Sequence, residues 1–399
     1  MPRDGVQVLK NEDYMKVLIT TDWYAPVING VVTSVLLLKR ELEARGHEVR
    51  VVTLSDTMHS YKDGNVYYMG SVSANRIYPG ARLRINRTRS LVRELIAWRP
   101  DVIHSQCEFS TFRVAYALSN HLGVPIVHTY HTVYEDYTHY VFPSVRVGKY
   151  VVSVFSRWIC GRTACVVAPT RKVADLLRNY NVRCRVEVIP TGVDLAAYRK
   201  EPEPGRMEAL RRKWAIPEDK VVLLYLGRMA REKNLEQLID QVAAAGRRDA
   251  VLLLVGDGPD REEVLNYARS RGVEVIFTGM VPHSEVADYY RLGDLFITAS
   301  TSETQGLTYF EALAAGVPVL CRKDPCVDGV IENGVNGWQY EDTEGFTGAL
   351  AAFCGSGERR EAKDSAEKFS AEAFGAAAAE LYASVQAEAA GAFSEGDPA

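Results

Sequence analysis

The chain has 399 residues, of which 47% are hydrophobic and 25% charged, and its formal net charge is -4 at pH 7. This length exceeds one ordinary hydrophobic core and predicts two domains of a folded protein. The weakly negative charge gives no overall basic footprint, so we do not expect nucleic acid as a partner. Because no apolar run approaches about 18 residues, we expect neither a membrane-spanning helix nor a signal peptide.

The seven cysteines are scattered along the chain without C-x-x-C pairs. This usage predicts reduced, mostly buried thiols in a cytoplasmic protein. Cys321 and Cys326 come nearest to a metal-binding pair. No matching cluster of ligands follows them, so no metal is expected.

Apolar runs of strand length alternate with helix-length segments, and this alternation occurs twice. Such a repeated pattern predicts two parallel-sheet α/β domains, which bind ligands at the carboxyl ends of their strands. A charged, proline-containing linker separates them. The expected parts are a loose leader (1–14), a first domain (15–195), a second domain (196–369), an alanine-rich helix (370–390) and a tail (391–399), with Met15 as an alternative start.

One stretch of the second domain carries two carboxylates, Glu303 and Glu311, at opposite ends of a loop followed by a helix. Eight helical residues span roughly 12 Å, too far for both carboxylates to act on one glycosidic bond. We therefore expect two anchors along one extended ligand. The backbone amides of Gly306 and Leu307, at the helix start, suit its charged or hydroxyl-rich part. The alternative is two incidental surface carboxylates.

Two further strand-end loops suit phosphate binding. Arg228 and Lys233 follow a strand directly and provide a forked and a point-like cation, which can hold a diphosphate without a metal. Gly30 opens a helix after the first strand, where backbone amides can meet an anion. Taken singly, the two cations are typical of solvated surface residues. Because neither G-x-G-x-x-G nor a Walker sequence occurs, a nicotinamide dinucleotide site and phosphoryl transfer are not favoured.

Four motifs in this order resemble the large retaining glycosyltransferase family 4 with its E-x7-E motif: Gly30, Gly227-Arg228…Glu232-Lys233, Gly256-Asp257-Gly258-Pro259 and Glu303-x7-Glu311. The resemblance runs from Met15 to the C-terminal helix. It implies the α/β GT-B fold, in which two Rossmann-like domains face each other and the active site lies in the cleft between them. The first domain would bind the acceptor and the second the nucleotide-sugar, and the C-terminal helix would pack back across the domain junction.

The resemblance also assigns roles to single residues. It implies a metal-independent, retaining hexosyltransferase that uses a UDP-sugar as co-substrate and no cofactor, with the leaving phosphate accepting the acceptor's proton. His128 is the alternative to His131. The implied catalytic residues are His131, Glu303, Arg228 and Lys233; Gly30, Arg228 and Lys233 would bind the diphosphate, His131, Glu303, Gly306 and Leu307 the sugar, and Glu311, Gly279 and Val281 the nucleotide ribose or base.

Two segments of the first domain, Arg82–Arg93 and Val145–Arg162, interleave cations with apolar residues. This pattern suits an element lying on an anionic bilayer, but also a helix that buries its apolar stripe in the domain. For the bilayer reading, the membrane or acceptor side would carry Arg146, Lys149, Arg157 and Trp158.

Within the family, His128–Tyr140 and Asp324–Val330 look like bacterial 1,2-diacylglycerol 3-α-glucosyltransferases. That likeness implies glucosyl transfer from UDP-glucose to the free hydroxyl of diacylglycerol, by a protein associated with the inner face of the cell membrane through anionic lipid. The alternatives are phosphatidylinositol, a polysaccharide or a soluble small molecule as acceptor, or a non-enzymatic nucleotide-sugar-binding protein. The hexose and the oligomeric state stay open.

Overall fold

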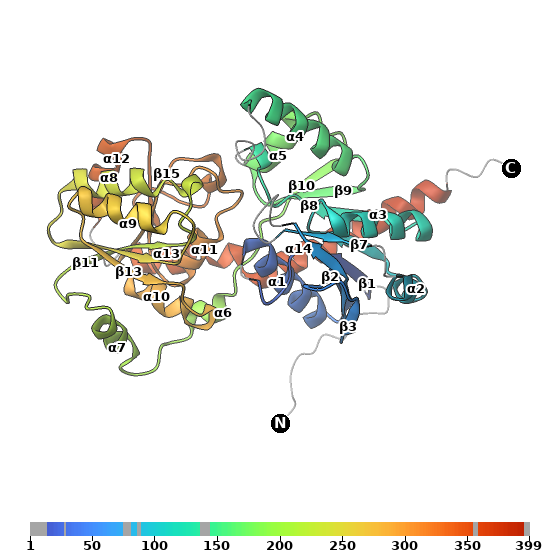
Figure 1. Cartoon of the computed structure of the whole chain (residues 1–399), viewed down its shortest axis with the longest axis horizontal. Coiled ribbons are helices and arrows are strands. Elements are labelled where there is room, and N and C mark those ends of the chain that lie inside the picture. Colours follow the sequence, from blue (N-terminus) through green and yellow to red (C-terminus); the bar gives the residue numbers. More distant parts are fainter. Residues whose placement is uncertain are drawn as a thin grey trace. The chain divides into compact units, whose positions relative to one another are not determined.

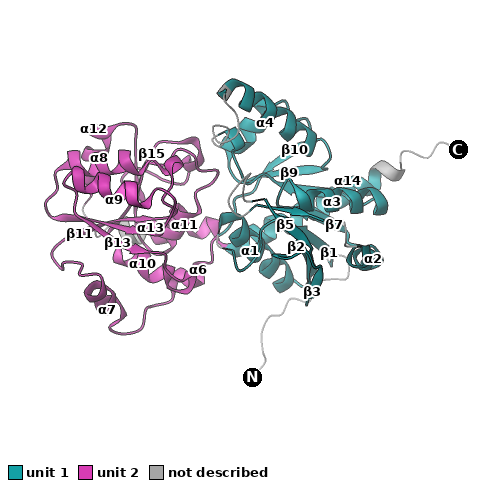
Figure 2. Cartoon of the chain, viewed as in Figure 1, with its two compact units in different colours: residues 1–192, 371–399 teal, residues 193–370 magenta. Residues whose placement is uncertain are grey.

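The computed structural model describes residues 14–27, 29–74, 81–85, 89–135, 144–353 and 358–394. Nearly all of the predicted leader and half of the predicted tail lie outside these residues. The chain folds into two compact units, shown in Figure 2. Unit 1 comprises residues 1–192 and 371–399, and unit 2 comprises residues 193–370. Each unit is described by itself, and the predicted cleft between the domains stays a prediction.

Unit 1 is built on an eight-stranded sheet with the strand order β10-β9-β8-β7-β1-β2-β4-β3. Its neighbouring strands are parallel except β3, which runs antiparallel to β4. A separate antiparallel pair joins β5 to β6. The strands are β1 (Lys16–Thr20), β2 (Glu48–Leu54), β3 (Tyr61–Asp63), β4 (Val66–Met69), β5 (Ser71–Ser73), β6 (Arg82–Arg84), β7 (Val102–Ser105), β8 (Ile126–Thr129), β9 (Cys165–Ala168) and β10 (Arg185–Val188).

Helices cover both faces of this sheet (Figure 1). Because side chains alternate along a strand, Val17 and Ile19 of β1 join the core under one set of helices and Leu18 joins the core under the other. The C-terminal helix belongs to the first set and packs along α1. Its predicted packing across the domain junction stays a prediction. The helices are α1 (Gly30–Ala44), α2 (Arg89–Trp98), α3 (Ser110–Leu122), α4 (Val145–Cys160), α5 (Arg171–Asn179) and α14 (Ala371–Ser394).

Unit 2 is built on a six-stranded sheet in which all neighbouring strands are parallel. Its strand order, β13-β12-β11-β14-β15-β16, is that of a Rossmann fold. In chain order its strands alternate with helices, as the sequence predicts. The strands are β11 (Val221–Leu226), β12 (Ala250–Val255), β13 (Val275–Gly279), β14 (Leu295–Thr298), β15 (Val319–Arg322) and β16 (Gly337–Tyr340).

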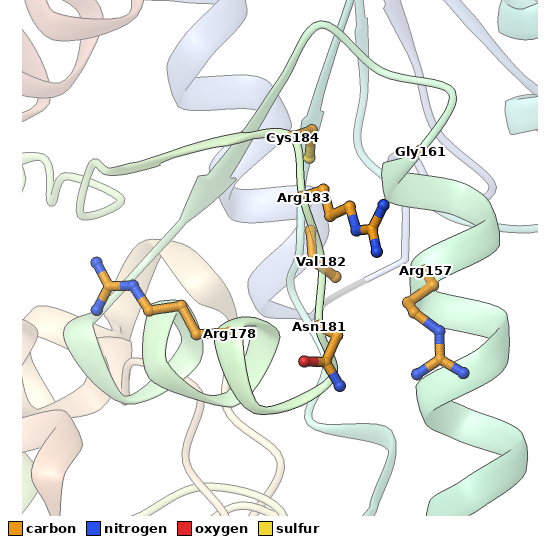
Figure 3. A pocket seen from close by; sticks show the side chains of 7 residues that line it. All are labelled: Arg157, Gly161, Arg178, Asn181, Val182, Arg183 and Cys184. Atoms are coloured by element: carbon orange, nitrogen blue, oxygen red, sulfur yellow. The ribbon is translucent and has the colours of Figure 1, made fainter.

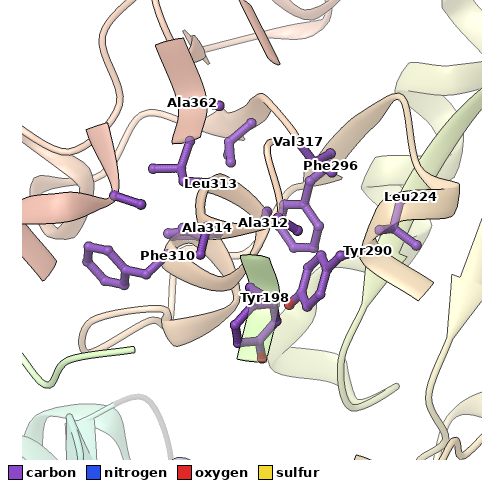
Figure 4. Packing of buried hydrophobic residues seen from close by; sticks show 14 of the residues in the cluster. Tyr198, Leu224, Tyr290, Phe296, Phe310, Ala312, Leu313, Ala314, Val317 and Ala362 are labelled. Atoms are coloured by element: carbon purple, nitrogen blue, oxygen red, sulfur yellow. The ribbon is translucent and has the colours of Figure 1, made fainter. Parts of the chain in front are cut away.

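The helices of unit 2 also form two layers. Val222 and Leu224 of β11 face the layer of α10 and α11, whereas Leu223 and Tyr225 face the layer of α8, α9 and α12. Figure 4 shows the first of these cores, where aromatic rings and small residues of α11 pack together. The helices are α6 (Leu195–Arg199), α7 (Arg206–Lys213), α8 (Leu235–Ala245), α9 (Arg261–Ser270), α10 (Val286–Leu292), α11 (Leu307–Ala314), α12 (Thr343–Ala352) and α13 (Glu358–Ser365), with the short 3-10 helices η2 (Arg231–Lys233), η3 (His283–Glu285), η4 (Pro325–Val327) and η5 (Glu367–Phe369).

Each sheet has one point where the strand order reverses. In unit 1 it lies between β1 and β7, and in unit 2 between β11 and β14. Loops leaving the carboxyl ends of two such strands run to opposite sides of the sheet and leave a crevice where ligands bind. A site is therefore expected on these loops, which comprise residues 21–27, 29 and 106–109 in unit 1, and residues 227–234 and 299–306 in unit 2.

Two glycines let the loop after β11 lie against the turn after β12. A Cβ on Gly256 would lie 2.1 Å from the carbonyl oxygen of Gly227, and one on Gly258 would lie 2.1 Å from that of Met229. The close approach is fixed by the Met229 amide, which donates to Asp257 O at 2.9 Å. The Gly-Asp-Gly-Pro motif thus supports the loop that carries Arg228 and Lys233.

We predict that Gly258→Ala lowers the free energy of unfolding by about 1–3 kcal/mol, because the added methyl group must displace packed backbone. Urea denaturation measures this change. The matched control is Gly348→Ala on α12, where an added Cβ meets nothing within 4 Å. That control should be neutral or more stable by up to about 1 kcal/mol, and equal stability of both variants would contradict the packing role.

Candidate active site

The loops at the reversal point of unit 2 are joined by an ion pair. Lys233 Nζ, at the end of η2, lies 2.6 Å from Glu303 Oε1. Both side chains are largely shielded, with 21% and 17% of their surface exposed. The Ser302 hydroxyl donates to Glu232 O at 3.0 Å and ties the same two loops together. Two predicted site residues from distant parts of the chain are thus adjacent.

The helix after Glu303 begins at a residue with a left-handed backbone. Gly306 precedes α11 with φ 73°, and a Cβ there would lie 2.6 Å from the Tyr309 ring. Because glycine has no side chain to cap the helix, the first amides of the helix, including that of Leu307, point out of its N-terminus. The helix start at Gly306 is as predicted, and the binding of sugar hydroxyls by these amides stays a prediction.

Glu311 lies one turn into α11 and rests on tyrosines. Its Oε2 accepts a hydrogen bond from the Tyr290 hydroxyl at 2.8 Å, and Tyr198 is a second side-chain partner. Burial raises the pKa of the Glu311 carboxyl, and the two tyrosine hydroxyls oppose this effect. The rings of Tyr198 and Tyr290 meet edge to face (Figure 4). Sequence reasoning missed both tyrosines.

The other predicted residues of unit 2 lie on neighbouring loops. Arg228 is exposed, and its carbonyl oxygen accepts from the Tyr225 hydroxyl at 2.9 Å. Gly279 ends β13 with φ 70°, and its carbonyl oxygen accepts from the Gly256 amide at 3.0 Å. Val281 packs partly buried against the core. All three lie at or after the carboxyl ends of strands on one side of the reversal point.

In unit 1, the loop after β1 leads into a capped helix start. Asn29 Oδ1 accepts from the Val32 amide at 2.9 Å, and Gly30 is the first residue of α1. Asp22 in the same loop accepts from the amides of Ser110 and Thr111, at 3.0 and 2.7 Å. Sequence reasoning missed this carboxylate, which holds the loop against the start of α3.

The two candidate histidines have different surroundings. His128 lies within β8, is fully buried and contacts Ser105 O through Nδ1 at 3.1 Å. His131 follows the strand, is partly exposed, and its Nε2 lies 2.6 Å from Gln106 Oε1. Because that oxygen accepts, Nε2 carries the proton and Nδ1 is an acceptor. Burial lowers the pKa of His131 to about 4, so the ring is neutral near pH 7.

A buried carboxylate, Glu108, lies beside these histidines. Its Oε2 accepts from the Tyr134 hydroxyl at 2.5 Å, and its Oε1 lies 3.4 Å from His128 Nε2. Within the described residues, Glu108 Oε1 and His128 Nε2 have no hydrogen-bond partner. Gln106 and Glu108 both follow β7, at the reversal point of unit 1. The only sequence signal for Gln106 and Glu108 as site residues was that they are polar and follow a buried strand.

The basic segment around α4 has the predicted amphipathic character. Its exposed face is mainly apolar, and two of its cations have partners within the protein. One face exposes five apolar side chains, each at least 40% exposed: Val147, Tyr150, Val151, Val154 and Trp158. We call this face the α4 stripe. Arg146 is exposed.

Two of the predicted lipid-facing cations of α4 have protein partners. Lys149 pairs with Glu135 at 2.7 Å, and Arg157 donates to Tyr180 O at 2.8 Å. In the other basic segment Arg82 is a structural residue, because it donates to the carbonyl oxygens of Ser55 and Asp56. Residues 86–88 of that segment lie outside the described ranges.

Across the part of the chain that is described, no group of three His, Cys, Asp or Glu residues is arranged to hold a metal ion. Within the same residues, no helix has both the length and the apolar character needed to cross a membrane.

Two family models match nearly the whole chain. Glycosyltransferase Family 4 matches residues 28–197 and Glycosyl transferases group 1 matches residues 206–369. The chain belongs to glycosyltransferase family 4. The predicted family and the predicted enzyme class, a retaining hexosyltransferase, are thereby confirmed.

Individual proteins agree with this assignment. The glycosyltransferase is 35% identical to the alpha-monoglucosyldiacylglycerol synthase of Streptococcus pneumoniae, over 84% of this chain and 77% of that one. It is 32% identical to the synthase of the same name from Acholeplasma laidlawii, over 83% and 86%. The crystal structure of Anabaena HepE with UDP-glucose superimposes with a TM-score of 0.71 at 18% identity, covering 93% of this chain and all of that one. The predicted GT-B fold is confirmed.

The low pKa of His131 predicts how the stability of the glycosyltransferase depends on pH. The folded pKa of about 4 lies below the ordinary 6.5, so between these values the unfolded chain binds more protons. Stability should therefore fall as the pH drops from 6.5 towards 4, by at most about 1.4 kcal/mol per pH unit for this residue. Urea unfolding at several pH values measures the slope.

In His131→Asn the dependence of the unfolding free energy on pH should become shallower. The control His121→Asn, at an exposed position, should leave this dependence unchanged. Buried His104, whose pKa burial also lowers, sustains the remaining slope. An unchanged slope in His131→Asn would contradict a neutral His131.

Proposed function

We propose that this glycosyltransferase transfers glucose from UDP-glucose to the free hydroxyl of 1,2-diacylglycerol at a membrane surface, giving an α-glucosyl-diacylglycerol. The observation that carries the proposal is the likeness, over most of the chain, to two proteins named alpha-monoglucosyldiacylglycerol synthase. The donor is supported by the fold shared with a protein crystallised with UDP-glucose. No cofactor is part of the proposal.

The donor is proposed to bind along the strand-end loops of unit 2. Arg228 and Lys233 offset the charge of the diphosphate, which grows as the bond to the sugar breaks. Glu303 and the backbone amides of Gly306, just before α11, and Leu307, its first residue, bind the sugar hydroxyls. The ion pair at 2.6 Å supports this order, because it places the sugar-binding carboxylate next to the phosphate-binding cation.

The nucleotide end of the donor is proposed to lie at Glu311. Its two tyrosine partners hold the carboxylate in one orientation, which suits the paired hydroxyls of a ribose. The backbone at Gly279 and Val281 meets the base. The family resemblance adds two residues of unit 1: Gly30 for the diphosphate and His131 for the sugar, where the neutral ring offers Nδ1 as an acceptor for a hydroxyl.

The transfer is proposed to retain the α configuration by attack on the face that the leaving group departs from. The bond from the sugar C1 to the diphosphate oxygen breaks, and a new bond from C1 to the acceptor oxygen forms. The proton of the acceptor hydroxyl passes to the leaving phosphate. The protein then needs to supply positioning and charge stabilisation, which are the properties of Lys233, Arg228 and Glu303.

Purified protein incubated with diacylglycerol vesicles is predicted to form glucosyl-diacylglycerol from UDP-glucose, in preference to UDP-galactose or GDP-mannose. Mass spectrometry identifies the product, and cleavage by an α-glucosidase shows its anomeric form. Lys233→Ala should lower kcat/KM at least tenfold, or about 1.4 kcal/mol, because charge on the leaving group peaks in the transition state.

The matched control for Lys233→Ala is Arg212→Ala, an exposed cation on α7 of the same unit. It should retain wild-type kinetics. If product forms only on phosphatidylinositol or on a soluble acceptor, diacylglycerol is not the acceptor. If no donor gives any product, the protein binds nucleotide-sugars without transferring the sugar.

Membrane association is proposed to occur through the α4 stripe, with Arg146, Lys149, Arg157 and Trp158 on the lipid side. Interfacial helices combine such an exposed apolar face with flanking cations. On a helical projection Arg146 and Arg157 edge the stripe, where they can reach anionic headgroups. Lys149 and Arg157 already have protein partners, so they are expected to contribute less to membrane binding. The apolar stripe itself is expected to contribute much of the binding. Localisation at the inner face of the cell membrane follows from this proposal.

We predict that Tyr150→Ser with Val154→Ser reduces cosedimentation with anionic vesicles at least tenfold, since each exposed side chain loses its apolar contact with lipid. Both positions are at least 40% exposed, so folding should survive. The matched control is Val335→Ser in unit 2, which is also 40% exposed. Undiminished vesicle binding by the double variant would show that α4 is an ordinary surface helix.

A further inference from the structure

A concave site in unit 1 lies apart from the loops discussed above. A cavity of about 760 Å³ opens where α4 and α5 end, before strands β9 and β10 begin (Figure 3). It therefore lies at the amino ends of these parallel strands, whereas the proposed donor-binding residues of unit 2 follow carboxyl ends. Its lining residues are Arg157, Gly161, Arg178, Asn181, Val182, Arg183 and Cys184.

The cavity is lined by three arginines and by no acidic residue among those described. Arg157 is fixed by its hydrogen bond to Tyr180 O at the end of α5, and Arg178 pairs with Asp175 at 2.5 Å. Arg183 has no ion-pair partner among the described residues. Figure 3 shows the Arg183 side chain reaching toward α4, where Arg157 projects into the same gap. Two guanidinium groups that share a gap without a carboxylate favour an anion between them.

The chemistry of these groups points to a phosphate. Guanidinium groups bind phosphate oxygens through paired N–H donors, and a rigidly held Arg157 loses little freedom when it does so. The location points to a lipid, because Arg157 is followed directly by Trp158 of the α4 stripe. When the α4 stripe rests on a bilayer, the lipid phosphates lie at the level of this helix, and its exposed Trp158 is of a residue type favoured at membrane interfaces.

We infer that this cavity is a binding site for the headgroup phosphate of an anionic phospholipid, held by Arg157 and Arg183 and separate from the acceptor. The inference rests on the proposed membrane-surface function. It adds a specific lipid contact to the general attraction between a basic helix and an anionic bilayer. This contact would fix the orientation of α4 about its own axis on the membrane.

The test compares two anionic vesicles of equal surface charge, one containing phosphatidylglycerol and the other a fatty acid, in a phosphatidylcholine background. Wild-type protein should bind the phosphate-bearing vesicles more tightly. Arg183→Ala should weaken that binding more than about fivefold, the loss expected for one cation near such a surface, and should abolish the preference. Arg171→Ala, at the exposed opposite end of α5, removes the same charge and should preserve the preference.

A second readout locates the bound lipid. Cys184 lines the cavity and is partly exposed, whereas the other described cysteines are buried. Phosphatidylglycerol vesicles should therefore slow the labelling of Cys184 by an uncharged maleimide, followed by mass spectrometry of its peptide. In Arg183→Ala this protection should be lost, while Arg171→Ala should keep it.

Three outcomes would overturn the inference: equal binding to both anionic vesicles, an unchanged preference in Arg183→Ala, or labelling of Cys184 that the lipid does not slow. Protection of Cys184 by inorganic phosphate without vesicles would assign the cavity to the free ion instead. None of these measurements needs a nucleotide-sugar or turnover. A failure to glucosylate diacylglycerol would therefore leave the cavity result standing, and the reverse also holds.

Discussion

A parallel sheet can grow from its first strand in both directions, and the loops on either side of that first strand then separate. Both units of this glycosyltransferase use that separation. In unit 2 it brings together loops that follow β11 and β14, so that Lys233 and Glu303 meet although they are 70 positions apart in the chain. In unit 1 it places Asp22, Gln106 and Glu108 on the two loops that leave β1 and β7 at the reversal point. The positions of the functional side chains thus follow from strand order.

The Lys233–Glu303 pair also limits what each side chain can do. A lysine alone on a loop would lose much of its rotamer freedom on gripping a phosphate. Here the carboxylate already holds the ammonium group, so less freedom remains to be lost on binding. Gly256 and Gly258 also help to position this loop, because they allow the backbone around Arg228 to pack closely against the turn after β12. For the proposed diphosphate ligand, part of the affinity would therefore be built in during folding.

Sequence reasoning succeeded where a signal is local. The alternation of strands and helices, the helix start at Gly306 and the amphipathic α4 all follow from residue type and spacing over one or two turns. It failed where partners are distant. Tyr198, in a stretch interpreted as part of the linker, supports Glu311 from α6, and Arg82 binds carbonyl groups of a turn that has no pattern of its own. The four residues of β16 and the alanine- and glycine-rich α12 also gave too weak a periodicity to be placed.

The chain enters unit 2 and leaves it at the same spot. The Val193 amide donates to Phe369 O at 2.8 Å, and Val193 forms a bridge with Ser370. After that point α14 completes unit 1: Tyr382 is buried there, and its hydroxyl meets His104 of β7 at 2.5 Å. Unit 2 is therefore an insertion whose two ends are closed on each other. A premature stop just before α14 would leave unit 2 whole and would strip unit 1, most of which precedes unit 2 in the chain, of part of its core.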